Sequence, residues 1–296
     1  MTKTTSSRTI FLILNYAFLI VLALICILPF IHVASLSFSS AAAASANQVT
    51  FWPVDFHTYA YRWVMTRPEV WRSIGVSLAR IALGVTVNMS LVLVTAFPLS
   101  KENTQFPWRT VYAWFFFVTL LVSGGLVPSF LIVKYTGIMN TMWALVLPIA
   151  LPIGLLVLML NFMRQVPKEL EQAARIDGAG YMRTLVWIYI PMSLPAIATL
   201  SLFSIVAHWN SWFDGIIYMN STRKYPFQSY LRSLVAATNL SAQGMLDLEE
   251  QERMRYVSDR TLKSAQIILG TVPILLFYPY LQKYFTKGIV VGSVKG

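Results

Sequence analysis

The residue types that carry chemistry in enzymes are few and widely separated in this chain. Its three histidines are His32, His57 and His208, its single cysteine is Cys26, and few acids fall within apolar stretches. Embedded proteases and transferases need a nucleophile beside a base, paired carboxylates or a cluster of metal ligands. One cysteine can form neither an intrachain disulfide nor a thiolate cluster. The sequence therefore disfavours a membrane enzyme and predicts no metal or cofactor held by this chain.

Polar side chains inside apolar runs are better candidates for function, because placing them in a membrane is costly. Arg80 lies about seven residues into the run 73–99, roughly 10 Å from its outer end at 1.5 Å per residue. Three roles are open for it: snorkelling to the surface, pairing with an acid on a partner subunit, or lining a pathway and attracting an anionic solute. Asn88 and Asn161 are expected to be structural.

A second group of candidates lies along the run 185–219. Ser201, Ser204, His208 and Trp212 follow at steps of three, four and four, which places them on one helix face. A face that combines polar and aromatic side chains can line a pathway for a polar solute, which favours this role for His208 and Trp212. Packing between helices is the alternative and suits the serines better, with Ser204 kept as a pathway candidate.

A short charged segment, residues 169–191, lies between two long apolar runs. Its side chains alternate in polarity at helical spacing. One broad face carries Leu170, Ala173, Ala174 and Ile176, and the rest carries Glu169, Gln172, Arg175 and Asp177. Gly178 ends this helix, because glycine takes the positive φ that follows a last turn, and Pro191 marks a second break. We predict a cytoplasmic docking helix over 168–178.

The composition identifies an integral membrane protein. Hydrophobic residues make up 56% of the 296 residues and charged residues 12%, against about a quarter charged in soluble domains. The net charge of +11 does not indicate nucleic-acid binding, because many basic residues lie near the ends of apolar runs, where they set topology. The expected environment is membrane lipid.

Six membrane-spanning helices position these residues in an all-α fold. The predicted spans are 10–33, 73–99, 111–133, 142–163, 185–219 and 263–285. Lys3 and Arg8 place the amino terminus in the cytoplasm, and an even number of spans returns the carboxyl terminus there. An uncleaved first span is favoured over a signal peptide, although 41–46 imitates a cleavage site. The longest polar segment, 220–261, is expected outside, with a short exposed helix near its acidic-basic run.

Breaks are expected within three of the spans. Gly124, Gly125 and Pro128 weaken the outer end of 111–133. Pro148, Pro152 and Gly154 bend or break 142–163. Pro191 and Pro195 bend the inner end of 185–219. Broken helices are common in transporters.

The spacing of the charged segment resembles the EAA loop of importer permeases. Gln172-Ala173-Ala174, Gly178, Ile188 and Ile190-Pro191 match the family pattern Glu-Ala-Ala, three residues, Gly, nine residues, Ile, one residue, Leu-Pro, with two letters changed. The flanking stretches 123–148 and 207–219 resemble the maltose-type permeases of carbohydrate ABC importers, in the branch serving oligosaccharides cut from polysaccharides. The resemblance spans nearly the whole chain.

This resemblance implies a single permease domain, 1–296, in the bacterial inner membrane. It implies a second permease, forming a heterodimer, two ATPase subunits that hold ATP and magnesium, and an external substrate-binding protein. The chain itself would hydrolyse no ATP. The residues implied in contact with the ATPase are Glu169, Glu171, Gln172, Ala173, Ala174, Arg175, Asp177, Gly178, Ile188 and Pro191.

Two points of the resemblance stay open. Gln172 stands where the family has a glutamate expected to contact the ATPase, so Glu169 or Glu171 replaces its charge, or the partner permease carries the full ion pair. Tyr225, Phe227 and Tyr230 are expected either to contact the binding protein or to cap the bilayer surface. The substrate is expected to be an oligosaccharide, with Arg80 favouring an acidic one. The alternatives are another small solute, such as an amino acid, peptide or osmolyte, and a sensor subunit.

Overall fold

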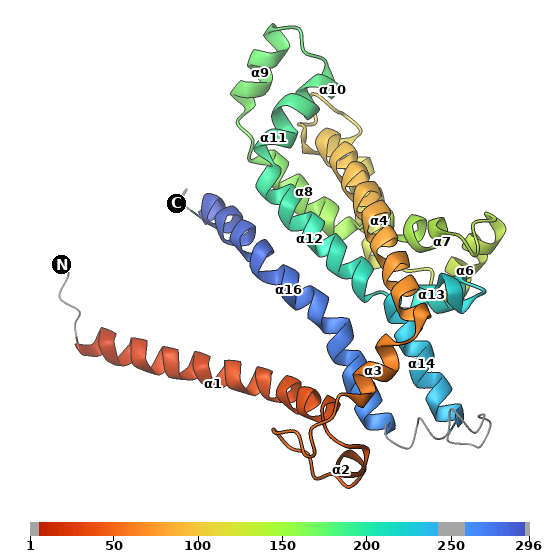
Figure 1. The fold of residues 1–296 in the computed structure, drawn as a ribbon. Helices are drawn as coiled ribbons and strands as arrows, with labels where there is room; N and C mark the ends of the chain where they lie inside the picture. The colour runs from red at the N-terminus through yellow and green to blue at the C-terminus, as the bar shows by residue number, and fades with distance from the viewer. Residues whose placement is uncertain (1–5, 242–257, 294–296) are drawn as a thin grey trace. The chain divides into compact units, whose positions relative to one another are not determined.

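The structure is a computed structural model that describes residues 6–241 and 258–293, and over these residues it consists of helices joined by turns and loops (Figure 1). The all-α fold predicted from the sequence is confirmed. The chain divides into two compact units, one comprising Met1–Pro68 and Ser233–Val272 and the other Glu69–Arg232 and Pro273–Gly296. Two helices, α14 (Phe227–Ser241) and α16 (Asp259–Ser293), contribute residues to both.

The first unit contains α1 (Ser6–Ser37), α2 (Ala41–Ser45) and α3 (Tyr59–Met65). The Arg8–Ser37 part of α1 exposes apolar side chains on all sides, as a helix surrounded by lipid does. The segment that follows α1 is fixed by Phe38, whose ring stacks on those of Phe56 and Tyr61.

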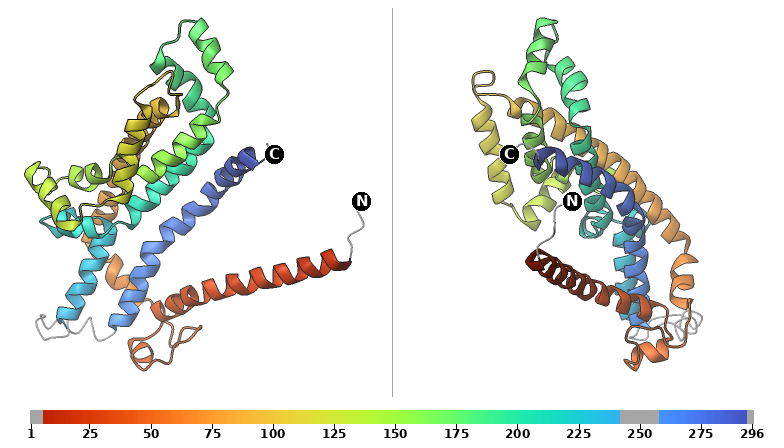
Figure 2. Two further views of the ribbon diagram at one scale, coloured as in Figure 1. Left: turned by 180° about the vertical axis from the view of Figure 1, so that it is seen from behind. Right: turned by 90° about the vertical axis from the view of Figure 1, so that its left-hand side faces the viewer.

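In the second unit, α4 (Pro68–Ser100), α8 (Ile153–Arg164) and α12 (Leu194–Asn210) run side by side (Figures 1 and 2). Both α9 (Lys168–Ile176) and α10 (Tyr181–Thr184) lie beyond one end of these three helices. The remaining elements are α5 (Arg109–Leu121), α6 (Leu126–Tyr135), α7 (Met142–Val146), η1 (Leu147–Ile149), the π-helical turn η2 (Leu185–Tyr189), α11 (Ile190–Met192), α13 (Phe213–Tyr218) and η3 (Thr222–Lys224).

Apolar side chains at helical spacing bind these helices into one core. α4 contributes Met89, Val92 and Ala96, and α8 contributes its own row at steps of three and four, Leu156, Met159 and Met163. α12 and η2 add Ala196, Leu200, Leu185 and Tyr189, and the remaining buried members are Phe97, Leu99 and Val166.

The three predicted breaks are confirmed, and two of them are sharper than expected. α5 and α6 meet at 116°, the α7–η1 segment meets α8 at 53°, and the segment from Tyr181 to Met192 meets α12 at 82°. Gly125 takes a φ of 81° at the first break, which glycine allows at little cost. The run 185–219, predicted as one span with a bent inner end, is divided among η2, α11, α12 and α13, because the chain turns at Ser193 and α12 ends at Asn210.

By length and composition, two helices of the described chain suffice to cross a membrane, Arg8–Ser37 and α4, and counting each bent pair as one span raises the number to five. The sixth expected span, 263–285, falls within α16, whose side chains are described only to residue 276. The count of six therefore stays a prediction. Of the expected outer loop, 220–261, the first part forms η3 and α14, and the predicted short exposed helix lies outside the described residues.

Candidate functional site: two polar clusters along α4

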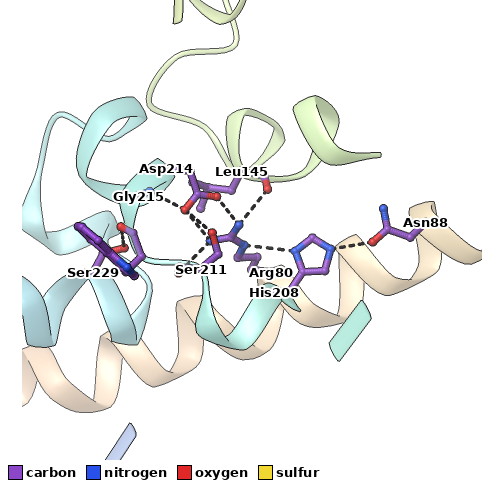
Figure 3. A network of polar contacts seen from close by, with 9 residues as sticks. Arg80, Asn88, Leu145, His208, Ser211, Asp214, Gly215 and Ser229 are labelled. Atoms are coloured by element: carbon purple, nitrogen blue, oxygen red, sulfur yellow. Dashed lines mark hydrogen bonds and ion pairs between the residues drawn. The ribbon is translucent and has the colours of Figure 1, made fainter. Parts of the chain in front are cut away.

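The first cluster lies in the interior between α4 and α12 (Figure 3). Arg80, Gly84 and Asn88 repeat at steps of four along α4 and are all buried, so they share one face. His208 of α12 packs against this face at Gly84, where an added Cβ would collide with the imidazole ring of His208. Only glycine at position 84 leaves room for the imidazole between the two polar side chains.

Arg80 is fully buried, and its guanidinium is bonded on every side within the chain. It donates from Nε to His208 Nδ1 at 3.4 Å, and its two terminal nitrogens form a bidentate ion pair with Asp214. The same nitrogens donate to the backbone carbonyls of Leu145 at 3.3 Å and Ser211 at 3.5 Å. An arginine has five N–H donors, and these five bonds use all of them. Arg80 therefore has a structural role in holding these helices together, and it has no N–H donor left to bind an anionic sugar.

Asn88 closes the other side of the cluster. Its Oδ1 atom accepts from Ser204 Oγ at 2.7 Å and contacts His208 Nε2 at 2.9 Å. Because His208 Nδ1 accepts from Arg80, the partners assign the imidazole proton to Nε2. Asn88 Nδ2 donates to the carbonyls of Ile149 and Ala150, both at 2.8 Å.

These contacts explain how broken helices are tolerated. In a continuous helix, the carbonyls of Ile149 and Ala150 would accept hydrogen bonds from the N–H groups four residues later. The 53° bend before α8 prevents these bonds. Backbone at membrane depth must find other partners, because lipid offers none. Two side chains of the unbroken α4, Arg80 and Asn88, supply donors to carbonyls at the ends of its broken neighbours.

Substituting Asn88 with leucine is expected to lower stability by about 2 kcal/mol or more, because the two carbonyls at the bend lose their donor. The measurement is the midpoint of thermal unfolding in detergent. Asn161→Leu is the matched control, since Asn161 is exposed on α8. Equal midpoints for the two variants would show that Asn88 does not support the bend.

The second cluster joins α9 to the end of α4. Lys101 Nζ donates to Glu171 Oε2 at 2.7 Å and to the Tyr189 hydroxyl at 2.9 Å, and that hydroxyl donates to Glu171 Oε2 at 2.8 Å. The ammonium also lies over the rings of Phe97 and Tyr189, 4.1 and 4.0 Å from their centroids. Arg175 donates to the other oxygen, Glu171 Oε1, at 2.8 Å.

This ion pair is shielded from solvent, with 5% of the Lys101 side chain and 8% of the Glu171 side chain exposed. Burial lowers the pKa of the Lys101 ammonium, and Glu171 opposes that shift. Burial alone would raise the pKa of the Glu171 carboxyl, but the hydrogen bonds from Lys101 and Tyr189 hold it below its ordinary value. The carboxylate therefore contributes stability above its unfolded pKa, and this contribution is lost as the pH falls through the lowered folded value.

Gly178 ends α9 as the sequence predicts. Its φ is +78°, and the N–H groups of Gly178 and Ala179 donate to the carbonyls of Arg175 and Ala174 at 3.0 and 2.8 Å. These two bonds form the Schellman pattern that ties the last turn of a helix to the chain after it. The direction in which the chain leaves α9 is thereby fixed.

The other residues predicted on α9 fall on two sides. Gln172 and Glu169 are exposed, as are Ala173, Asp177 and Arg175, whereas Ala174 is half-buried and Glu171 points inward. The apolar side chains expected to share a face with Ala174 are exposed too, Ile176 at 87%. Farther on, Ile188 is half-buried and Pro191 exposed.

The residues predicted to contact the substrate or the binding protein also differ in exposure, some being exposed and others buried. Trp212 is exposed, with the Arg232 guanidinium 5.0 Å from its ring centroid, whereas Ser204 and His208 are buried in the Arg80 cluster. Tyr225 is half-buried, but Phe227 and Tyr230 are buried. Both of these rings pack inward at the start of α14, where Phe227 meets Trp209, whereas the sequence predicted a contact with the binding protein or with the bilayer surface.

Asp214, Lys101 and Tyr189 are among the residues of these clusters that escaped the sequence analysis. A signal existed for the first, because Asp214 is the only acid within the six predicted spans, and a buried arginine needs a counter-ion. Lys101 follows a predicted span, where a basic residue is unremarkable in sequence. Tyr189 lies inside an apolar run, and nothing in the sequence brings it to Glu171.

The bent helices, the internally bonded breaks and the projecting helix α9 together define a helical membrane permease of the transporter class. No protein-family model matches the chain. It is 38% identical over 287 residues to the polygalacturonan/rhamnogalacturonan transport system permease protein YtcP of Bacillus subtilis (strain 168). This alignment covers 97% of this chain and 99% of YtcP. Protein LplC of the same organism is 35% identical over 292 residues, covering 99% and 97%.

A solved structure agrees with these relatives. The chain matches, with a TM-score of 0.82 and 28% identity, a chain from the crystal structure of a bacterial ABC transporter involved in the import of the acidic polysaccharide alginate. The match covers 96% of this chain and 100% of that one. The chain therefore belongs to the sugar permeases of ABC transporters, as the EAA-type spacing predicted, and it is an integral membrane protein, as the composition predicted.

Proposed function

We propose that this chain forms, with a second permease, the membrane pathway of an ATP-driven importer for oligosaccharides derived from an acidic polysaccharide. Two ATPase subunits dock on α9 and hold ATP and magnesium, and a substrate-binding protein delivers the sugar from outside. This chain binds no cofactor and hydrolyses no ATP. The chain lies in the bacterial inner membrane, and both of its termini are in the cytoplasm.

The orientation of α9 carries the proposal. Glu171 anchors the helix from within, and Leu170, Gln172 and Ile176 of the same helix are exposed. The helix itself lies beyond one end of α4, α8 and α12 (Figure 1). Tyr181 and Met182 of α10 are exposed apolar side chains as well. Large exposed apolar side chains rimmed by polar groups are typical of a protein-binding surface. A helix that is anchored inside and apolar outside suits transmission of motion from a docked ATPase.

Support for an acidic sugar comes from the relatives, since YtcP is named for polygalacturonan and rhamnogalacturonan and the matched transporter imports alginate. The buried Arg80 gives no such support, because Asp214 neutralises it.

Uptake in proteoliposomes tests the function. The chain is reconstituted with its second permease, ATPase subunits and binding protein, and labelled oligosaccharides of galacturonate, of alginate and of neutral maltodextrin are supplied outside. We expect ATP-dependent accumulation of an acidic oligosaccharide and little of the neutral one. Preferential uptake of the maltodextrin would contradict the substrate class, and sugar accumulation equal with and without ATP would contradict the importer.

A further inference from the structure

We propose that the Lys101–Glu171 pair is the joint through which α9 moves α4, with Tyr189 as its third member. This inference rests on the proposed docking of an ATPase on α9. It assigns Glu171 an inward, positioning role in place of a contact with the ATPase.

The need for such a joint follows from the order of the chain. α9 is connected directly to α8 and α10, so a displacement of α9 reaches those elements along the backbone. The end of α4 is 70 residues away in sequence from Glu171. A displacement of α9 can therefore reach the end of α4 only through contacts between side chains or packed surfaces.

Within residues 6–241 and 258–293, two ion pairs connect α9 to the segment that follows α4. Lys101–Glu171 is the buried one. The other, Glu102–Lys168, is solvent-exposed, with 56% and 71% of the two side chains accessible. An exposed pair between long side chains adds little, because water and salt screen it and its side chains lose freedom. The buried pair is therefore the stiff connection.

The geometry of the buried pair resists displacement in several directions. Both oxygens of Glu171 are occupied, one by Lys101 and Tyr189 and the other by Arg175. The Lys101 ammonium is held by two hydrogen bonds and by two ring faces. Separating these groups would leave a charge buried without its partner, which is far more costly than separating an exposed pair. A movement of α9 is therefore transmitted to α4 before the joint opens.

α4 carries that movement to the other cluster. Arg80 lies 21 residues before Lys101 on a helix that continues almost to the joint, which is about 30 Å at 1.5 Å per residue. Arg80 and Asn88 hold the carbonyls at the bends of the neighbouring helices. Displacing α4 therefore shifts the bends themselves, which is how a rigid element changes the opening of a pathway.

The test is the number of oligosaccharide molecules transported per ATP hydrolysed by the complete complex in proteoliposomes. Glu171→Gln and Lys101→Met are each expected to lower this ratio about tenfold, within the range of coupling between sites, while ATP hydrolysis continues. The double variant is expected to be no worse than either single one, because both remove the same joint. Glu102→Gln, which breaks the exposed pair at the same place, is expected to leave the ratio unchanged.

A reversible crosslink separates a mechanical role from a merely structural one. Lys101→Cys and Glu171→Cys are combined with Cys26→Ser, which removes the chain's single native thiol. A short bis-methanethiosulfonate reagent is expected to restore the transport ratio, and a reducing agent to abolish it again. A crosslinked pair with the ratio still low, or Glu171→Gln indistinguishable from Glu102→Gln, would overturn the joint.

Ile176→Glu, on the outward side of α9, distinguishes failure of the joint from failure of the proposed function. If Ile176→Glu uncouples transport but Glu171→Gln does not, α9 docks on the ATPase and only the joint is refuted. If Ile176→Glu and Glu171→Gln both leave the transport ratio and ATP hydrolysis unchanged, α9 is not the coupling element and both proposals fall.

Discussion

Substituting Asp214 with asparagine is expected to destabilise the folded chain by about 3–5 kcal/mol, because it leaves a buried charge without its counter-ion. Arg80 is fully buried, while 19% of the Asp214 side chain is exposed. The guanidinium cannot escape the penalty by losing its proton, since arginine stays charged in proteins. The asparagine keeps a hydrogen bond but not the charge. The measurement is the midpoint of thermal unfolding in detergent, together with the yield of monodisperse protein.

Two further variants make this prediction specific. Asp177→Asn removes an acid from the exposed end of α9, and its midpoint of thermal unfolding is expected to equal that of the unsubstituted chain. The pair Arg80→Met with Asp214→Leu removes both charges, and it is expected to recover most of the loss, because replacing a whole buried ion pair by apolar side chains is often near neutral. Recovery stays incomplete, since the carbonyls of Leu145 and Ser211 lose the Arg80 donors. A double variant less stable than Asp214→Asn would refute the pairing as the cause.

The breaks in the helices could be predicted from local chemistry. Pro152 removes an N–H, Gly125 permits a positive φ, and Gly178 permits the turn that ends α9. Each of these effects depends on one residue and its immediate neighbours. The sequence therefore located the bends and the end of the docking helix, although the angles depend on packing between helices.

The partners of the charged residues could not be predicted in the same way. Arg80 and Asp214 are 134 residues apart, and Glu171 and Lys101 are 70 apart. Helical spacing gives the face on which a residue lies, but which faces meet depends on how the bent helices pack. The prediction for Glu171 illustrates this, because its place on α9 was known while its direction, inward to Lys101, was not.

Substituting Gly178 with valine is expected to reduce ATP-driven uptake about tenfold. The cost is conformational, because a left-handed residue with a Cβ costs roughly 1–2 kcal/mol, most of all a β-branched one. An added Cβ at Gly178 would meet no atom of this chain within 4 Å, so steric conflict inside the chain is not the cause. To relieve the strain, the valine variant must open the bonds from Gly178 and Ala179 that fix the end of α9. Uptake is compared at equal amounts of folded complex.

Gly178→Asn is the control that isolates the backbone. Asparagine adopts the left-handed conformation far more readily than valine, so this variant is expected to keep most of the uptake despite its larger side chain. Gly178→Ala should fall between the two, because it adds a Cβ without a β-branch. If asparagine and valine reduced uptake equally, the size of the side chain would be the cause, and Gly178 would be a surface on which the ATPase packs. If valine left uptake unchanged, a fixed exit from α9 would not be needed for coupling, since the joint at Glu171 lies seven residues earlier and would suffice to hold the helix.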